Sequence, residues 1–397
     1  MSNVVGIEDR GDVAGPSGDI RLVSRADLAR SPRWANAFAG KRKDHRFYEL
    51  VEDTLSEGVD YRYFAICDAR GEVTAIQPFF ILDQDIVLGA GPAISKLVGT
   101  IRRLWPRCLM LRTLMVGCVA GEGHLDGAPG SLDANARRLA AGIVAQARRL
   151  RAPLIVLKEF PKQYRQVFDC FLEHGFARMP SLPMTRLNID YANFEDYMTR
   201  ALNSATRRKL RKKFKIAEQA APIEMSVVED ATPVADEIYP LYLQVYERSK
   251  LHFEKLTKAF LCGVGRLMPD RARFFIWRQD GRMVAFSLCL LEGESLYAEY
   301  IGLDYSVALD LHLYHYIVRD MTAWAIANGC TWFRSSGLNY DPKLHLRHQL
   351  DPIDLYVRHA SPAANAVLRR VLPWIEPTRN DPILKKFANY DELWERP

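Results

Sequence analysis

The chain has 397 residues, of which 54 are Lys or Arg and 48 are Asp or Glu, so its formal net charge is +6, and 48% of it is hydrophobic. These values are typical of a soluble globular protein long enough for two domains. No run of eighteen apolar residues occurs, so we expect no membrane-spanning helix. Seven cysteines without CxxC spacing predict reduced thiols in the core of a cytoplasmic protein.

The first half predicts alternating helices and strands. Residues 1–18 are rich in Gly, Asp, Pro and Ser, and we expect a disordered leader. The elements that follow are a helix over 46–58, a hairpin over 61–82, a strand over 108–121, a helix over 133–152, a strand over 153–160 and a helix over 164–175. Two prolines within 178–190 indicate a boundary, which gives domains at 19–182 and 183–397.

The second half repeats this order of elements. Residues 273–303 predict three antiparallel strands, with turns at Asp280-Gly281 and Gly293-Glu294. A long helix over 308–329 and a strand over 330–336 follow. A hairpin, a strand, a long helix and a strand therefore occur twice, which favours two tandem α/β domains.

Two stretches of the second half resemble a known family. The stretch NFEDYMTRALNSATRRKLRKKF, residues 193–214, has an aromatic and acidic start, a Ser or Thr cap and a strongly basic helix. Residues 309–348 add a long helix, a strand, a glycine and a loop with Lys and Arg. Both are similar to FemAB-like members of the GNAT acyltransferase superfamily, over roughly residues 185–360. The resemblance implies two GNAT-like domains, each with a mixed, largely antiparallel sheet flanked by helices, and acyl transfer to an amine.

The resemblance also implies an acyl donor. Simple GNAT enzymes bind the pyrophosphate of acyl-CoA with a glycine-containing loop at a helix N-terminus. The corresponding residues 304–312 contain no glycine, so that loop is not recognisable here. Divergent relatives take the acyl group from aminoacyl-tRNA, which makes tRNA the partner in the alternative interpretation.

The basic helix predicts an anion site or a solvated basic face. Seven of the nine residues 207–215 are Lys or Arg, and no acid stands between Thr206 and Ala217. Solvated helices usually include Glu to relieve repulsion between like charges, so we favour a negatively charged ligand as much as water. The candidate ligand-binding residues, together with two from the loop after the last strand, are Arg207, Arg208, Arg211, Lys212, Lys343 and Arg347.

A second segment without acids lies at residues 92–107, PAISKLVGTIRRLWPR. Its apolar side chains fall on one helical face, with Trp105 near one end and cations opposite. That pattern is typical of a helix that lies in a membrane interface, so it predicts a peripheral contact with an anionic membrane. A helix that packs onto the core is the alternative.

Acyl transfer to an amine needs a base for the ammonium proton and N–H donors for the oxyanion, which a bulged strand provides. The candidate catalytic residues are Glu299, Tyr300, Glu122, His124, His312 and His315. Glu299 stands within an apolar strand, where a carboxylate is costly unless it is paired or functional. Strict alternation places Tyr300 on the opposite face. The alternatives are a structural ion pair for Glu299, an ordinary turn for the Glu122 loop and core packing for the helical histidines.

Other catalytic arrangements have weaker support in the sequence. No Ser-His-Asp or Gly-x-Ser-x-Gly pattern is visible, which favours direct transfer over a covalent acyl-enzyme. His345, His348 and Asp351 lack a fourth ligand at suitable spacing, so we expect no metal.

We therefore expect an N-acyltransferase that moves an acyl group from an acyl thioester to a primary amine. The two cationic amphipathic segments favour a long-chain acyl group, an amphiphilic amine such as a sphingoid base, or both, in a ceramide-synthase-like reaction. The alternatives are an aminoacyl-tRNA-dependent peptidyl transferase acting on a cell-wall precursor, and a GNAT-like protein that binds its ligand without turnover.

Overall fold

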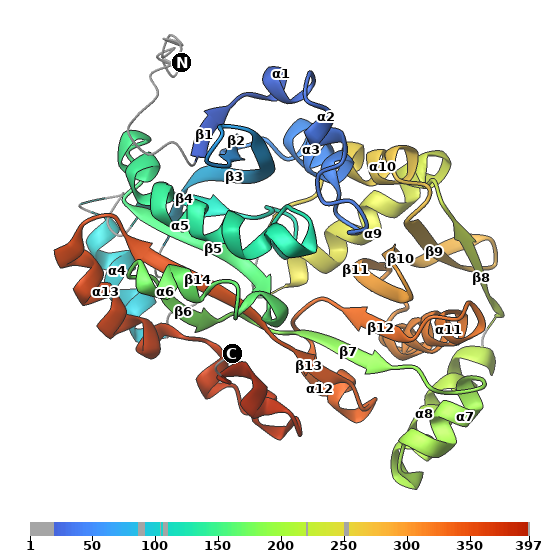
Figure 1. The fold of residues 1–397 in the computed structure, drawn as a ribbon. Helices are drawn as coiled ribbons and strands as arrows, with labels where there is room; N and C mark the ends of the chain where they lie inside the picture. The colour runs from blue at the N-terminus through green and yellow to red at the C-terminus, as the bar shows by residue number, and fades with distance from the viewer. Residues whose placement is uncertain are drawn as a thin grey trace.

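Two seven-stranded sheets organise the computed structural model, which describes residues 20–85, 92–103, 105, 110–219, 221–249 and 254–395 (Figure 1). The first sheet runs in the order β1 (Ile20–Val23), β2 (Asp60–Cys67), β3 (Val73–Asp85), β4 (Met110–Val116), β5 (Leu154–Pro161), β14 (Ile353–His359) and β6 (Ala177–Pro180). The second runs in the order β13 (Gln349–Asp351), β7 (Met184–Asn188), β12 (Trp332–Ser335), β11 (Ser295–Leu303), β10 (Arg282–Glu292), β9 (Ala272–Gln279) and β8 (Ile223–Val228). The expected leader lies outside the described residues.

Helices flank both sheets. Those of the first half are α1 (Arg25–Leu28), α2 (Pro32–Ala35), α3 (His45–Thr54), α4 (Pro92–Arg102), α5 (Leu132–Arg149) and α6 (Asp169–Glu173). Those of the second half are α7 (Phe194–Ala201), α8 (Ser204–Gln219), α9 (Ala235–Arg248), α10 (Lys258–Leu267), α11 (Leu313–Ala327), α12 (Tyr340–His345) and α13 (Pro362–Ile375). Most strand pairs are antiparallel, and β4–β5 and β11–β12 are parallel. The predicted class of two mixed, largely antiparallel α/β units is confirmed.

The two sheets have the same strand order, with β14 and β7 in equivalent positions. These are the last strands of the two repeats, and each lies in the sheet of the other repeat. Strand β7 follows β6 along the chain, yet it pairs with β12 and β13 of the second sheet. Strand β14 follows β13, yet it pairs with β5 and β6 of the first. In Figure 1 the orange-red β14 lies among green strands, and the green β7 lies among orange ones. The segment 183–397 therefore contributes to both sheets.

The first sheet has a different cover on each face. Helix α5 buries Ala136, Leu139, Ala140, Ile143 and Ala147 against one face, at the spacing of one helical stripe. The other face has its own buried hydrophobic cluster, made of Leu154, Val156 and Val357 of the sheet and Leu372 of α13. Because strand side chains alternate between faces, α5 and α13 lie on opposite sides of this sheet.

One hydrophobic core crosses between the halves. It includes Phe47 and Leu50 of α3 and Phe260 of α10, with the rings of Phe47 and Phe260 5.7 Å apart. A Cβ built on Gly263 of α10 would stand 2.2 Å from a methyl carbon of Leu50, so any larger residue there would displace the Leu50 side chain. The close approach of α3 and α10 fixes the two sheets relative to each other.

The segment 92–107 is only partly described. Helix α4 buries Val98, whereas Ile101 and Trp105 are exposed, and so are Lys96 and Arg103. Arg102 forms a bidentate pair with Asp85 of β3, each bond 2.7 Å long. Residues 104 and 106–109 lie outside the described residues. None of the described helices reaches the length and apolarity of a membrane span.

Candidate active site

A cavity of about 1680 Å³ lies between the two halves. Its apolar part is formed by the face of the first sheet under α13, through Leu111, Met115, Leu154, Val156, Leu355, Val357, Leu368 and Leu372. Its polar part is formed by Glu122, Lys158, Glu159, Glu254, Glu299, Tyr300, Lys343 and His348. Both sheets therefore contribute to one space with two chemical environments.

Strand β11 has a bulge at Glu299. Tyr300 pairs with Leu288 of β10 and Ala298 pairs with Cys289, so Glu299 is the extra residue. Tyr297 pairs with Leu290, which is two residues from Leu288 and therefore on the same face. The expectation that alternation continues through Glu299 is wrong, because the bulge returns Tyr300 to the face of Tyr297.

Strands β11 and β12 separate next to the bulge. Their parallel pairing covers only Ser295–Ala298 and Trp332–Ser335, while β11 continues to Leu303. The N–H of Ser336 still donates to the Ala298 carbonyl at 3.3 Å. Beyond it, residues 298–301 and 335–339 line the cavity on the two sides of what we call the strand gap. A reactive carbonyl can reach backbone N–H groups there.

The corresponding place in the first sheet is filled. Strands β4 and β5 pair up to Val116 and Leu157, and the chain after β4 then folds over β5. The N–H of Gly123 donates to the Glu159 carbonyl at 3.2 Å. A Cβ on Gly123 would stand 2.7 Å from the Lys158 carbonyl oxygen, so this glycine permits the close contact. The glycine-rich loop thus closes the first gap.

An ion cluster joins that loop to the bulge. The Nε of Arg42 donates to Oε1 of Glu299 at 2.6 Å, and Arg42 also pairs with Glu122. The Nζ of Lys43 donates to Oε2 of Glu122 at 2.8 Å and stands 3.7 Å from Glu299. Burial alone would raise the pKa of the Glu122 carboxyl, but Arg42 and Lys43 hold that pKa well below its ordinary value.

His124 belongs to the same cluster. Its Nε2 lies 3.2 Å from Oε1 of Glu122, and its Nδ1 lies 3.4 Å from the Tyr164 hydroxyl. Burial lowers the pKa of His124 below its ordinary value, although Glu122 opposes that effect. The structure therefore brings three predicted residues together. Sequence reasoning missed their basic partners, whose only signal was the run GKRKDH before α3.

Glu254 is a carboxyl group of the polar part that the sequence did not reveal. The Tyr300 hydroxyl donates to its Oε1 at 2.6 Å. Burial raises the pKa of the Glu254 carboxyl, while Lys158 and the Tyr300 hydrogen bond oppose the rise. A carboxylate with a raised pKa is a stronger base than an exposed one. Its short segment before α10 carried no pattern that could have indicated the site.

The basic helix α8 packs Leu210, Phe214 and Ala217 inward, as its spacing predicts. The Lys213 amine donates to Nε2 of His315 at 2.9 Å. Burial lowers the pKa of His315 to about 4, and Lys213 adds to the effect. His312 stands at the N-cap of α11 in a left-handed conformation, with φ 50°. Both histidines thus lie in a cationic cluster beside α8. In the first turn of α11, Tyr314 is the residue that lines the cavity.

The candidate ligand-binding residues occupy three settings. Arg207 donates to the carbonyls of Thr199 and Leu202, and Arg211 pairs with Glu195. The remaining exposed cations are Arg208, Lys212 and Arg347. Lys343 is buried and lines the cavity. It is therefore the one of the six candidate ligand-binding residues that lies in the site. Among the described residues, no group of three His, Cys, Asp or Glu side chains could hold a metal ion.

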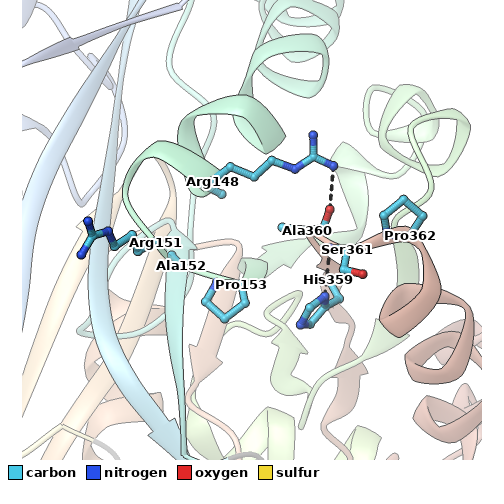
Figure 2. A pocket seen from close by; sticks show the side chains of 9 residues that line it. Arg148, Arg151, Ala152, Pro153, His359, Ala360, Ser361 and Pro362 are labelled. Atoms are coloured by element: carbon cyan, nitrogen blue, oxygen red, sulfur yellow. Dashed lines mark hydrogen bonds between the residues drawn. The ribbon is translucent and has the colours of Figure 1, made fainter.

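A smaller hollow of about 410 Å³ lies where α5 ends near the β14–α13 connection (Figure 2). Figure 2 shows the Arg148 side chain reaching toward the Ala360 carbonyl. Its guanidinium donates to that carbonyl oxygen at 2.8 Å. The N–H of Ser361 donates to Nδ1 of His359 at 3.0 Å. The Arg148 bond anchors the start of α13 to the first half, and the Ser361 bond is local to the β14–α13 connection.

Comparison with known proteins identifies the class. Residues 204–343 match the family model described as an acetyltransferase (GNAT) domain. This part of the chain is therefore similar to a GNAT acetyltransferase domain, which supports acyltransferase activity. The resemblance to the FemAB-like, double-GNAT group is confirmed by this domain together with the duplicated sheet. No curated protein matches the chain.

The solved structures that match this chain have low sequence identity to it. The C-terminal domain of a candidate lysylphosphatidylglycerol synthetase from Agrobacterium fabrum is 12% identical, with a TM-score of 0.49, over 83% of this chain and 95% of that one. FemX is 11% identical, with a TM-score of 0.47, over 84% and 96%. A tandem GNAT protein from the clavulanic acid biosynthesis pathway is 10% identical, with a TM-score of 0.44, over 87% and 99%.

Proposed function

We propose that the protein transfers a long-chain acyl group from an acyl thioester, acyl-CoA in the first instance, to the primary amine of an amphiphile such as a sphingoid base. The observation that carries this proposal is the cavity of about 1680 Å³ with an apolar part and an acid-rich polar part. The apolar part suits a hydrocarbon chain. The carboxylates beside the strand gap suit a cationic amine.

The chemistry follows from the order of the groups. An ammonium in the polar part loses its proton to Glu254, and the neutral nitrogen attacks the thioester carbonyl in the strand gap. Backbone N–H groups of β11 stabilise the oxyanion. A C–N bond forms and the C–S bond breaks, and the leaving thiolate is protonated by the second proton that the nitrogen loses. The pairing of Glu299 with Arg42 suits it to positioning the bulge, and its proposed role as proton acceptor is tested below.

The cations near the start of α11 suit the diphosphate of acyl-CoA. Lys212 and Arg208 are exposed on α8, and Lys213 reaches His315 in the first turn of α11. A helix N-terminus and several cations together favour an anionic group. This arrangement would replace the glycine loop that the sequence lacks.

The direct test combines palmitoyl-CoA or acetyl-CoA with sphinganine and detects the N-acyl product by mass spectrometry. We expect palmitoyl transfer to exceed acetyl transfer at least about tenfold, because each buried methylene adds about 0.8 kcal/mol. The substitution Val156→Trp narrows the apolar part, so it should shift the preference toward shorter chains. Leu172→Trp, at an exposed position of α6, is the matched control. Equal use of both donors by the wild type would contradict the proposal.

We further propose that an anionic membrane supplies the amphiphile through α13. Val367, Val371 and Trp374 are exposed by 60%, 43% and 85% and follow helical spacing. Arg369 and Arg370 are exposed between them, and α13 contains no acid. Val367 and Val371 also line the cavity, so the exposed stripe borders its opening. Apolar residues flanked by cations are typical of an interfacial helix.

Flotation with phosphatidylglycerol vesicles tests this contact. Val371→Ser with Trp374→Ser should reduce binding at least about fivefold, and Arg103→Ser with Trp105→Ser tests the predicted segment 92–107 separately. Leu309→Ser is the control, since Leu309 is 73% exposed elsewhere. Unchanged binding in both double variants would exclude the membrane contact.

The exposed cations of α8 favour one second candidate, an aminoacyl-tRNA-dependent peptidyl transferase. Arg208, Lys209, Lys212 and Lys215 form an exposed basic face suited to a phosphate backbone. Loss of activity after RNase treatment would support that reaction. Retained function after Glu299→Gln together with His124→Ala would instead indicate binding without turnover.

A further inference from the structure

Two basic side chains in the cavity have no acidic partner. Lys343 and His348 are each 6% exposed, and both line the cavity. They come from α12 and the turn after it, where the His348 N–H donates to the Lys343 carbonyl at 3.0 Å. Within the described part of the chain, Lys343 forms no ion pair, and neither ring nitrogen of His348 has a hydrogen-bond partner.

Buried polar groups without partners are costly, so their presence needs a reason. A buried side-chain nitrogen without a hydrogen bond costs about 1–3 kcal/mol. The Lys343 amine keeps one bond, 2.6 Å long, to the Ser336 carbonyl. Burial lowers the pKa of Lys343 to about 7. Burial and Lys343 together lower the pKa of His348 to about 3.

These groups stand close to the strand gap. The Lys343 amine donates to the Ser336 carbonyl. The Ser336 N–H in turn donates to the carbonyl of Ala298, the residue before the bulge. The rings of Phe333 and His348 meet edge to face with their centres 5.8 Å apart, and both residues line the cavity. The cavity therefore has acids near Glu254 and Glu299 and a separate basic pocket next to the same backbone.

We infer that Lys343 and His348 form a subsite for an oxyanion, a carboxylate or phosphate, carried by the amphiphilic substrate. An oxyanion provides acceptors for the lysine amine and for one imidazole N–H, so it would satisfy both side chains at once. If the amine of the same substrate lies near Glu254 and Glu299, the acceptor is a zwitterionic amine. This inference rests on the proposed function for the reaction, but the binding of an anion can be measured without turnover.

The binding test uses the full chain with three probes: decyl phosphate, decanol and inorganic phosphate. Calorimetry should give decyl phosphate at least about tenfold tighter binding than either of the others. Lys343→Met should abolish that preference, whereas Lys385→Met, at an exposed lysine, should keep it. Equal binding of decyl phosphate and decanol would overturn the inference. Inorganic phosphate binding as tightly as decyl phosphate would also overturn it, since the site would then take a free ion.

A measurement on the wild type covers the case in which Lys343→Met fails to fold. Decyl phosphate should shift the ring ¹⁵N resonances of His348 in the labelled protein, and decanol should leave them in place. An unshifted ring with decyl phosphate bound would place the anion elsewhere and overturn the inference. Acyl transfer to sphinganine that persists after such a result would leave the proposed function intact. If the His348 ring resonances shift but no acyl transfer to sphinganine is detected, the proposed function is contradicted and the anion subsite stands.

Discussion

The Nε of Arg42 lies 2.6 Å from Oε1 of Glu299, a residue 257 positions further along the chain. Arg42 comes from the segment before α3, and Glu299 is the extra residue of the β11 bulge. The side chain of Arg42 is 1% exposed, and its guanidinium lies 3.5 Å from the centre of the Tyr297 ring. One buried cation thus ties the first half to the strand that forms the gap.

Removal of this cation should destabilise the protein. Arg42→Met leaves Glu122 and Glu299 buried without their main partner, so we expect unfolding to become easier by about 3–5 kcal/mol. Urea unfolding followed by circular dichroism measures the change. Arg137→Met, which breaks an exposed pair with Asp133 on α5, is the control and should show no measurable change. If Arg42→Met is as stable as Arg137→Met, the ion cluster does not hold the two halves together.

Removal of the Glu254 carboxylate should lower turnover and leave the fold intact. Glu254→Gln keeps the hydrogen bond from Tyr300 but cannot accept a proton, so kcat should fall at least about 100-fold. Glu247→Gln, at an exposed position of α9, should leave kcat unchanged. If Glu299→Gln alone abolishes turnover with unchanged stability while Glu254→Gln does not, Glu299 is the proton acceptor, as the sequence predicts.

The pH profile provides a separate check on Glu254. Its carboxyl must be ionised to act as a base, so activity should be lost as pH falls through its raised pKa. The Tyr300 hydrogen bond lowers that pKa, and Tyr300→Phe should therefore move the acid limb of kcat/KM to higher pH. An acid limb that stays in place would mean that another group controls it.

Lys343 should make stability depend on pH. Its pKa is about 7 in the folded protein, against an ordinary 10.5. Between these values the unfolded chain binds more protons, so stability should rise with pH across that window. Lys343→Met removes the buried charge and should be more stable than the wild type by a few kcal/mol below pH 7, with the gain vanishing above pH 10.5. Urea unfolding in phosphate-free buffers measures this difference. A gain that is the same at every pH would contradict the assignment, and Lys385→Met is the control.

The exchanged strand should prevent the halves from folding separately. A fragment of residues 19–182 lacks β14, which lies between β5 and β6, and it exposes the α3 face that packs on α10. We expect no cooperative unfolding transition from this fragment alone, and association when it is co-expressed with residues 183–397. A cooperative transition from the isolated fragment would show that the exchange is dispensable.

Local patterns account for what the sequence determined. Helix α8 has its apolar stripe at Leu210, Phe214 and Ala217 because helical periodicity depends only on neighbours along the chain. The hairpins, the two long helices after parallel-paired strands and the repeated order of elements follow from the same short-range rules. The GNAT resemblance in the second half comes from residue types within one continuous stretch, which matches the family domain at 204–343.

Tertiary structure decided the composition of the site. The bulge at Glu299 depends on pairing with β10, and the exchange of β7 and β14 depends on which sheet edge each strand meets. Glu254 has a raised pKa only because the fold buries it, and Arg42 reaches Glu299 only because the halves share a core. The sequence determined which segments are helical or extended and which faces are apolar. Contacts between distant residues decided which charges meet, because electrostatic and packing energies depend on distance in space rather than on separation along the chain.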